Sequence, residues 1–305
     1  MIDGRSDRLD TRAVLLLLMC CALWGVNQVA SKVALAELPP LMQAAMRSAG
    51  AAVLLLAWVR WRGLALWGRD GTLGAGLLAG GLFAAEFACI FIGLQYTGAS
   101  RMVVFIYLAP FVVALGMPFL VPTERLDRWQ ALGLVTAFAG VVWAFFEGFV
   151  APSAGPKQWL GDALGIAAAV LWGLTTMVLR GSRLSTALPE KTLLYQLLVS
   201  GAALGAASFA AGEAWPRDVT ALSGLTLASL AFQTVIVTFG SYLVWFWLVR
   251  HYPATRLSAS TLLTPVFGLL AGVLLLGEPA TPRLLLALVA VAIGIALVNR
   301  RPREA

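Results

Sequence analysis

The chain of 305 residues contains ten apolar runs, each about long enough to cross a lipid bilayer. A membrane helix needs roughly 20 predominantly apolar residues, because it rises about 1.5 Å per residue through about 30 Å of hydrocarbon. Hydrophobic residues make up 60% of the chain and charged residues only 12%, about half the charged share of a soluble domain. The runs extend over 13–34, 39–59, 73–94, 98–120, 129–147, 159–180, 190–211, 224–248, 254–276 and 282–298. We therefore predict an all-α polytopic membrane protein with ten transmembrane helices.

The second half of the chain repeats the pattern of the first half. Leu23-Trp24-Gly25 is matched 148 residues later by Leu171-Trp172-Gly173. Three further single-residue pairs are offset by 155, 154 and 154 residues: Pro110 with Pro265, Glu124 with Glu278, and Gly140 with Gly294. Because each half contains five spans, an odd number, the second half must enter the membrane upside down. The sequence thus predicts two inverted five-helix repeats related by a pseudo-two-fold axis in the membrane plane.

The basic residues predict the orientation of these spans. With the amino terminus inside, all but six of the 22 Lys and Arg residues fall in cytoplasmic segments, which leaves 22 − 6 = 16 on that side. The six exceptions are Lys32, Arg47, Arg101, Lys157, Arg217 and Arg283. Cytoplasmic loops carry an excess of Lys and Arg, so both termini are expected in the cytoplasm. This orientation also supports an even number of spans.

The expected organisation follows from the repeat and the orientation. We predict a cytoplasmic segment over 1–12, a first five-helix repeat over 13–147 and an external linker over 148–158. A second repeat over 159–298 and a cytoplasmic tail over 299–305 complete the chain.

The chain resembles the drug/metabolite transporter superfamily, in its EamA-type branch. The residues that carry the resemblance in the first half are Leu23-Trp24-Gly25-Val26-Asn27, Lys32, Pro39-Pro40, Arg47, Gly93-Leu94, Tyr96-Thr97-Gly98-Ala99, Pro110 and Glu124-Arg125. In the second half they are Leu171-Trp172-Gly173, Pro265 and Leu276-Gly277-Glu278. The resemblance covers about residues 13–298. One departure is Val121-Pro122-Thr123-Glu124, where the family pattern usually reads Leu-Gly-Glu.

The resemblance implies a function as well as a fold. Within the family, the chain looks most like bacterial exporters of amino acids, including aromatic ones. It implies a secondary active transporter of the bacterial inner membrane that exports apolar or aromatic amino acids, with broad specificity, by alternating access. The alternatives left open are an exporter of other small metabolites or drugs, and a channel.

Polar and aromatic side chains within the apolar runs mark a candidate substrate cavity, because polar groups are costly in hydrocarbon. Trp24, Asn27 and Gln28 share one face of the first span, and Trp172 and Thr176 occupy the related position in the sixth. The seventh and eighth spans add Tyr195, Gln196, Gln233, Tyr242 and Trp245 as candidate substrate-binding residues. Each tryptophan precedes a glycine, so simple helix packing is the competing interpretation.

Two charged residues lie deep in predicted spans. Glu86 in the third span is a candidate for titrating a coupling proton or for binding a substrate amine. It could equally be a neutral carboxyl, or a carboxylate paired with Arg47 of the second span. Pro110 and Pro265 each fall near the middle of a span, where proline removes a backbone hydrogen bond, and both are hinge candidates.

Other classes of function find no support in the sequence. We find no phosphate-binding loop of the Gly-x-x-x-x-Gly-Lys-Ser/Thr type and no His-Glu-x-x-His zinc motif, and His251 is the single histidine. The net charge of +7 is explained by the cytoplasmic loops, so no nucleic-acid partner is expected. We expect no enzyme activity, no cofactor and no metal. The expected partners are the lipid bilayer and an amino acid, with protons as the candidate coupling ion.

Overall fold

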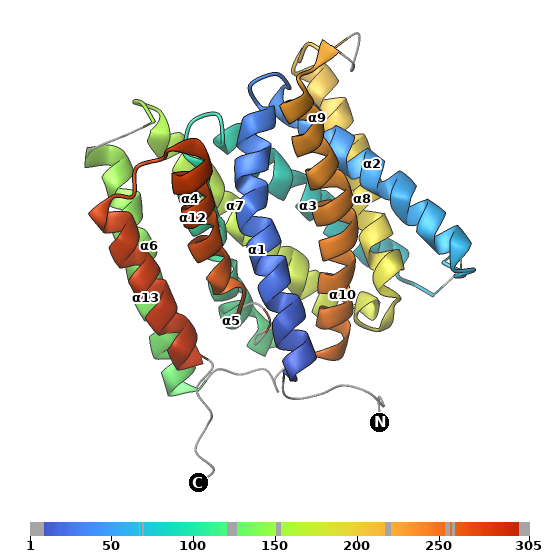
Figure 1. Cartoon of the computed structure of the whole chain (residues 1–305). Coiled ribbons are helices and arrows are strands. Elements are labelled where there is room, and N and C mark those ends of the chain that lie inside the picture. The colour runs from blue at the N-terminus through green and yellow to red at the C-terminus, as the bar shows by residue number, and fades with distance from the viewer. Residues whose placement is uncertain are drawn as a thin grey trace.

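The computed structural model describes residues 9–66, 68, 70–120, 127–150, 154–216, 221–253, 257 and 260–298. Every regular element among them is helical, and the helices form one bundle (Figure 1). We call the end of the bundle where α1 begins and α13 ends the lower end, as drawn in Figure 1, and the opposite end the upper end. Glu124 and Arg125 lie outside the described residues, as do residues 1–8 and 299–305.

The helices follow the predicted spans closely. Those of the first half are α1 (Thr11–Ala34), α2 (Pro40–Trp61), α3 (Leu73–Gly93), α4 (Ala99–Ile106), α5 (Ala109–Leu120) and α6 (Arg128–Val150). Those of the second half are α7 (Gln158–Gly181), η1 (Arg183–Thr186), α8 (Pro189–Ala210), α9 (Gly224–Ala231), η3 (Phe232–Ser241), α10 (Tyr242–His251), η4 (Thr261–Leu263), α12 (Thr264–Leu276) and α13 (Pro282–Val298). Here η1 and η4 are 3₁₀ turns and η3 is a π-helical stretch.

Seven helical segments within the described residues are long and apolar enough to cross a membrane. They are α1, α2, α3, α4 with α5, α7, α8, and α9 through η3 to α10. The predicted spans 129–147, 254–276 and 282–298 correspond to α6, α12 and α13. The chain is thus an all-helical, polytopic membrane protein.

Two predicted spans are interrupted near their middles. The fourth span ends its first helix at Ile106 and resumes at Ala109, with Pro110 in the first turn of α5. In the ninth span, the 3₁₀ turn Thr261–Leu263 precedes α12, where Pro265 lies in the first turn. Proline fits the first turn of a helix because the amide there needs no intrahelical partner. Each proline therefore begins a new helix segment after a break.

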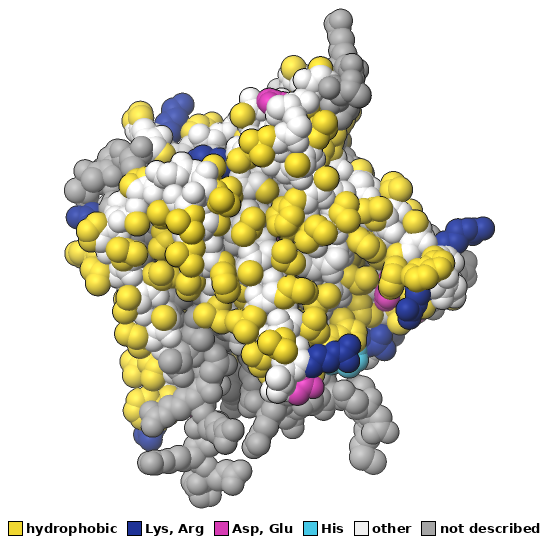
Figure 2. Space-filling model, viewed as in Figure 1, with side chains coloured by type: hydrophobic (Ala, Val, Ile, Leu, Met, Phe, Trp, Pro, Cys, Tyr) yellow, Lys and Arg dark blue, Asp and Glu magenta, His cyan; other side chains and the backbone are white. Residues whose placement is uncertain are grey.

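The exterior of the bundle is apolar. Figure 2 shows hydrophobic side chains spread over the middle of one face, with Lys and Arg side chains near its edges. Large exposed side chains include Leu115, Phe119 and Leu274, whose exposed fractions are 70%, 86% and 77%. Contiguous apolar surface of this kind is unfavourable in water and favourable against lipid chains.

Two glycines allow helices from different halves to pack closely. A Cβ atom added to Gly25 in α1 would lie 2.6 Å from the backbone nitrogen of Gly268 in α12. A Cβ atom added to Gly173 in α7 would lie 2.4 Å from the Cβ of Val112 in α5. The motif Leu-Trp-Gly therefore contains its glycine for a steric reason, at both places where it occurs.

Acidic side chains of the second half cap helices of the first half at the upper end. Gly277 adopts a left-handed conformation (φ 66°) at the end of α12, and Glu278 follows it. The Glu278 carboxylate accepts hydrogen bonds from the backbone amides of Ala99 and Ser100 at 2.8 and 2.9 Å, at the start of α4. In the same way, Glu213 accepts from the amides of Leu41 and Met42 at the start of α2. A carboxylate stabilises these positions because helix N-termini carry unpaired amides and partial positive charge.

The close approach of α1 and α12 yields a stability prediction. Gly25→Ala should lower the thermal unfolding temperature in detergent, because the new methyl group meets backbone atoms that cannot move independently; overpacking of this kind costs about 1–3 kcal/mol. Gly81→Ala in α3 is the matched control, since its added Cβ would have no heavy atom within 4 Å. Equal unfolding temperatures for the two variants would contradict the packing role of Gly25.

Candidate central cavity

A cavity lies in the middle of the bundle, where residues of α1, α3, α4, α7, α8 and α10 meet. Its volume is about 70 Å³, which is enough to hold a few water molecules. Nine of the substrate-binding candidates named from the sequence line it: Trp24, Asn27, Gln28, Glu86, Trp172, Thr176, Gln196, Tyr242 and Trp245. No described residue of the ninth span, which contains Pro265, lines it.

An aromatic cluster forms one part of the wall, and Trp24 is its centre. The Trp24 ring makes edge-to-face contacts with Trp172, Tyr242 and Trp245, at centroid distances of 6.1, 6.1 and 5.4 Å. Its indole nitrogen donates a 2.8 Å hydrogen bond to the Ser241 hydroxyl, which fixes the ring. The two repeated tryptophans are therefore brought together across the two halves. Such a surface suits an apolar or aromatic group of a ligand, or a cation that lies over the face of a ring.

A polar wall is formed by residues of α1, α3 and α8. Asn27 and Gln28 come from α1, Glu86 from α3 and Gln196 from α8. All four are buried, and each has at least one side-chain oxygen without a hydrogen-bond partner. Thr176 also lines the cavity, but its hydroxyl donates to the Trp172 carbonyl of its own helix at 3.1 Å. Unpaired buried oxygen atoms are costly, so the polar wall is chemically suited to a ligand that donates hydrogen bonds.

Arg47 lies behind this cavity and does not line it. Its side chain is fully buried, and its guanidinium carbon lies 3.8 Å from the centre of the Phe87 ring. One terminal nitrogen donates a 3.4 Å hydrogen bond to the Tyr242 hydroxyl, while Nε and Nη1 have no partner. No ion pair joins Arg47 to Glu86 among the described residues, and Oε2 of Glu86 is unpaired. The pairing that the sequence left open is therefore absent from this arrangement.

Two predicted site residues lie away from the cavity. Gln233 is fully buried among helices, where its Oε1 accepts hydrogen bonds from the Ser31 hydroxyl and the Gln43 amide, each at 3.2 Å. Tyr195 lies toward the lower end, with its hydroxyl 3.1 Å from that of Thr72. The two hydrogen bonds of Gln233 connect α1, α2 and η3, so this residue links helices.

Buried polar contacts join the two halves at the upper end. Arg101 of α4 forms a 2.6 Å ion pair with Asp162 of α7, and the Thr97 hydroxyl donates to the same carboxylate at 2.6 Å. The Lys32 ammonium at the end of α1 donates to the Thr97 carbonyl. Beside them opens a vestibule of about 520 Å³, and its lining includes Lys32, Arg101 and Glu278. Along α1, Lys32 of this vestibule is four residues from Gln28 of the central cavity, about one helical turn.

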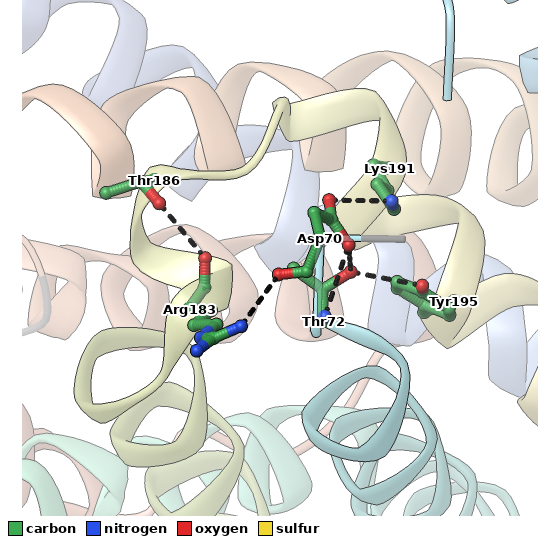
Figure 3. A network of polar contacts seen from close by, with 6 residues as sticks. All are labelled: Asp70, Thr72, Arg183, Thr186, Lys191 and Tyr195. Carbon is green, nitrogen blue, oxygen red and sulfur yellow. Dashed lines mark hydrogen bonds and ion pairs between the residues drawn. The ribbon is translucent and has the colours of Figure 1, made fainter. Parts of the chain in front are cut away.

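A second network joins the halves at the lower end (Figure 3). Asp70, in the loop between α2 and α3, accepts hydrogen bonds from the Lys191 ammonium at 2.8 Å and the Thr72 hydroxyl at 2.7 Å. Arg183 donates to the backbone carbonyl of Asp70 at 3.4 Å. The bond from Lys191, followed by that from Thr72, holds the pKa of the Asp70 carboxyl well below its ordinary value. The loop of the first half is thus fastened to η1 and α8 of the second.

Sequence reasoning missed several residues of these sites. Tyr107 lines the cavity and packs edge-to-face on Trp172 at 5.1 Å, and Phe83 and Phe87 complete the wall on α3. An aromatic residue in an apolar run carries no signal of its own, so these positions could not be distinguished. Asp162 did carry a signal, because it is a charge within a predicted span.

Comparison with known proteins decides the family. The model of the EamA-like transporter family matches residues 11–146 and 159–300. The chain belongs to the EamA-like transporter family. The predicted resemblance is therefore confirmed, and the cavity belongs to a membrane transporter.

Several relatives share the whole length of this EamA-like transporter. It is 30% identical over 302 residues to an uncharacterized transporter, YvbV, of Bacillus subtilis, covering 96% of this chain and 93% of that protein. It is 30% identical to a probable amino-acid metabolite efflux pump of Salmonella typhimurium, with 92% of both chains covered. A protein of the same description from Escherichia coli is 24% identical, again with 92% coverage of both.

The fold also matches a solved crystal structure of a protein. The TM-score is 0.72 at 20% sequence identity, with 94% of this chain and 97% of that chain covered. This likeness shows that the two chains share a fold.

The network of Figure 3 yields a prediction on pH. Asp70→Asn should lower the thermal unfolding temperature at pH 7, because it removes the negative charge that pairs with Lys191. Since the native pKa is lowered, the carboxylate stabilises the fold above the ordinary value of about 3.9 and loses that effect as the pH falls through the native value. The gap between wild type and variant, measured by thermal scans, should be constant from about pH 8 to pH 5 and narrow below about pH 4.

A second variant tests the pairing itself. Lys191→Met should give a loss similar to that of Asp70→Asn, and the double variant should lose little more than either single variant. Fully additive losses would show that Asp70 and Lys191 act independently.

Proposed function

We propose that this EamA-like transporter is a secondary carrier that exports amino acids by alternating access, with the substrate held in the central cavity. The observation that carries the proposal is a mid-bundle cavity with an aromatic wall and a polar wall, set between two polar networks that join the halves. A substrate at this site would be desolvated by Trp24 and Trp172 and bound by the amide and carboxyl groups opposite. Two relatives described as probable amino-acid metabolite efflux pumps support the substrate class.

The proposed mechanism uses two inverted five-helix repeats. In support, α1, the first span of the first half, packs on α12, in the fourth span of the second half. Likewise α7, the first span of the second half, packs on α5, in the fourth span of the first half. Gly25 and Gly173 make the close approach in the two cases. The breaks before Pro110 and Pro265 fall in related spans, so rocking of one half against the other can use them as hinges. Discontinuous helices also favour a binding site at the bilayer midplane.

The proposed orientation places the lower end of the bundle in the cytoplasm of a bacterial cell with the protein in the inner membrane. The distribution of basic residues supports it, because α2, α7 and α10 each end at the lower end with arginine in the last turn. The network of Asp70 and Lys191 then closes the cytoplasmic side, and the pair of Arg101 with Asp162 closes the external side. Alternating access requires that these two networks open in turn.

Glu86 is the proposed coupling residue. It is the charged residue among the described lining of the cavity, and its free oxygen gives it a place for either a proton or a substrate ammonium. Arg47 lies nearby on the far side of Phe87 and Tyr242 and provides positive potential without blocking the cavity. Exchange of a proton for a substrate at one carboxylate would couple the two fluxes.

Counterflow in liposomes tests this function. Purified protein is reconstituted with unlabelled phenylalanine inside, and uptake of labelled phenylalanine is followed against protein-free liposomes. We expect transient accumulation of label, which a carrier produces and a channel does not. Flux that follows only the electrical and chemical gradients would indicate a channel. Counterflow of other metabolites or drugs without any amino acid would replace the substrate class.

Trp172→Ala tests the role of the aromatic wall. Transport of phenylalanine and tryptophan should fall at least about tenfold, because an edge-to-face partner of each bulky side chain is lost, whereas alanine transport should change by less than about threefold. The matched control is Trp159→Ala, at the start of α7 and 44% exposed. An equal fall for all substrates would assign Trp172 to packing alone.

A further inference from the structure

The polar wall of the cavity contains one charged group and several unpaired hydrogen-bonding groups. Glu86 is the single charged side chain among the described residues that line the cavity. Four oxygen atoms of this wall have no partner, on Asn27, Gln28, Glu86 and Gln196. Each of the three amide side chains of the wall, on Asn27, Gln28 and Gln196, also has an NH₂ donor. The wall therefore offers both acceptors and donors, and its one charged side chain, Glu86, is acidic.

This composition matches an ammonium group better than a carboxylate. An ammonium provides three donors and a positive charge, which pair with a carboxylate and with amide oxygens. A substrate carboxylate beside Glu86 would face a like charge, and burying two like charges together is costly. The faces of Trp24, Trp172 and Tyr242 favour a cation too.

The buried guanidinium of Arg47 lies near the site without lining it. It packs on the Phe87 ring at 3.8 Å and donates a 3.4 Å hydrogen bond to the Tyr242 hydroxyl. Both Phe87 and Tyr242 line the cavity, whereas Arg47 does not.

We propose that the cavity recognises the ammonium of its substrate through Glu86 and the oxygens of Asn27 and Gln28, and that a substrate carboxylate is not required. The transporter should then also bind primary amines with an apolar or aromatic body. This inference rests on the proposed function, since it concerns the same cavity. It widens the substrate class from zwitterionic amino acids to ammonium compounds in general, of which amino acids are one kind.

Three related compounds test separately whether the ammonium and the carboxylate of an amino acid are recognised. Phenylalanine has both groups, phenylethylamine lacks the carboxylate, and 3-phenylpropionate lacks the ammonium. Their binding to the purified full-length protein in detergent is measured by isothermal titration calorimetry, which avoids passive diffusion of amines across a membrane. Phenylethylamine should bind at least as tightly as phenylalanine, and 3-phenylpropionate at least about tenfold more weakly, a difference of about 1.4 kcal/mol.

Several results would overturn the inference. If phenylalanine binds at least tenfold tighter than phenylethylamine, the carboxylate is recognised, and Arg47→Gln should then abolish that advantage. If 3-phenylpropionate binds as well as phenylethylamine, the ammonium is not recognised. Counterflow of phenylalanine in either case leaves the proposed function standing. Absence of both binding and counterflow for every probe and amino acid would overturn the two together.

Substitutions test whether the Glu86 carboxylate causes the preference for an ammonium group. Glu86→Gln should weaken phenylethylamine at least about tenfold and leave 3-phenylpropionate unchanged or tighter, because the acidic charge is lost. Glu190→Gln in the first turn of α8 is the matched control for the same chemical change outside the cavity, and should alter neither affinity. Asn27→Asp provides a second test if Glu86→Gln does not fold, and it should strengthen phenylethylamine while weakening 3-phenylpropionate. Unchanged affinities in the folded variants would overturn the assignment.

Discussion

The constraint on which this structure depends is that hydrocarbon offers no hydrogen bonds. Each polar group placed at membrane depth must find its partner inside the protein or remain costly. The chain satisfies several of them across the boundary between its halves. Asp162 accepts from Arg101 and Thr97, Gln233 from Ser31 and Gln43, and Glu278 from the start of α4. These contacts bring helices from distant parts of the sequence together and determine where the polar wall of the cavity can lie.

The groups left unsatisfied are therefore informative. The oxygens of Asn27, Gln28 and Glu86 face one cavity and lack partners. Other polar side chains of α1 do have partners, since Trp24 donates to Ser241 and Ser31 donates to Gln233. The proposed function would explain the difference, because a site that binds and releases a small molecule must keep some of its polar atoms available. The aromatic cluster has the complementary property, since its rings pack on one another.

The sequence predicted the spans and the family more completely than the site. Apolar length and turn residues place α1 at Thr11–Ala34 against a predicted 13–34, and α13 at Pro282–Val298 against 282–298. The site residues that share a helix face with Trp24 were found because helix periodicity fixes which side chains point the same way. Tyr195 and Gln233 were grouped with them on chemistry alone, and they lie elsewhere. Chemistry identifies what could bind a ligand, whereas position depends on which helices are neighbours.

By itself, the sequence determined that this protein is helical and spans a membrane, because sixty per cent apolar residues in runs of about twenty leave no other stable arrangement. It also marked Pro110 and Pro265 as places where a span could bend, because proline cannot donate the hydrogen bond that a continuous helix needs. Only the tertiary structure decided that Trp24 meets Trp172, that Arg47 packs on Phe87 without lining the cavity, and that Gln196 reaches the cavity. Those outcomes depend on helix rotation and on close approach at Gly25 and Gly173. A rotation of α2 or α8 by a fraction of a turn would change which side chain faces the cavity while leaving every apolar run in place.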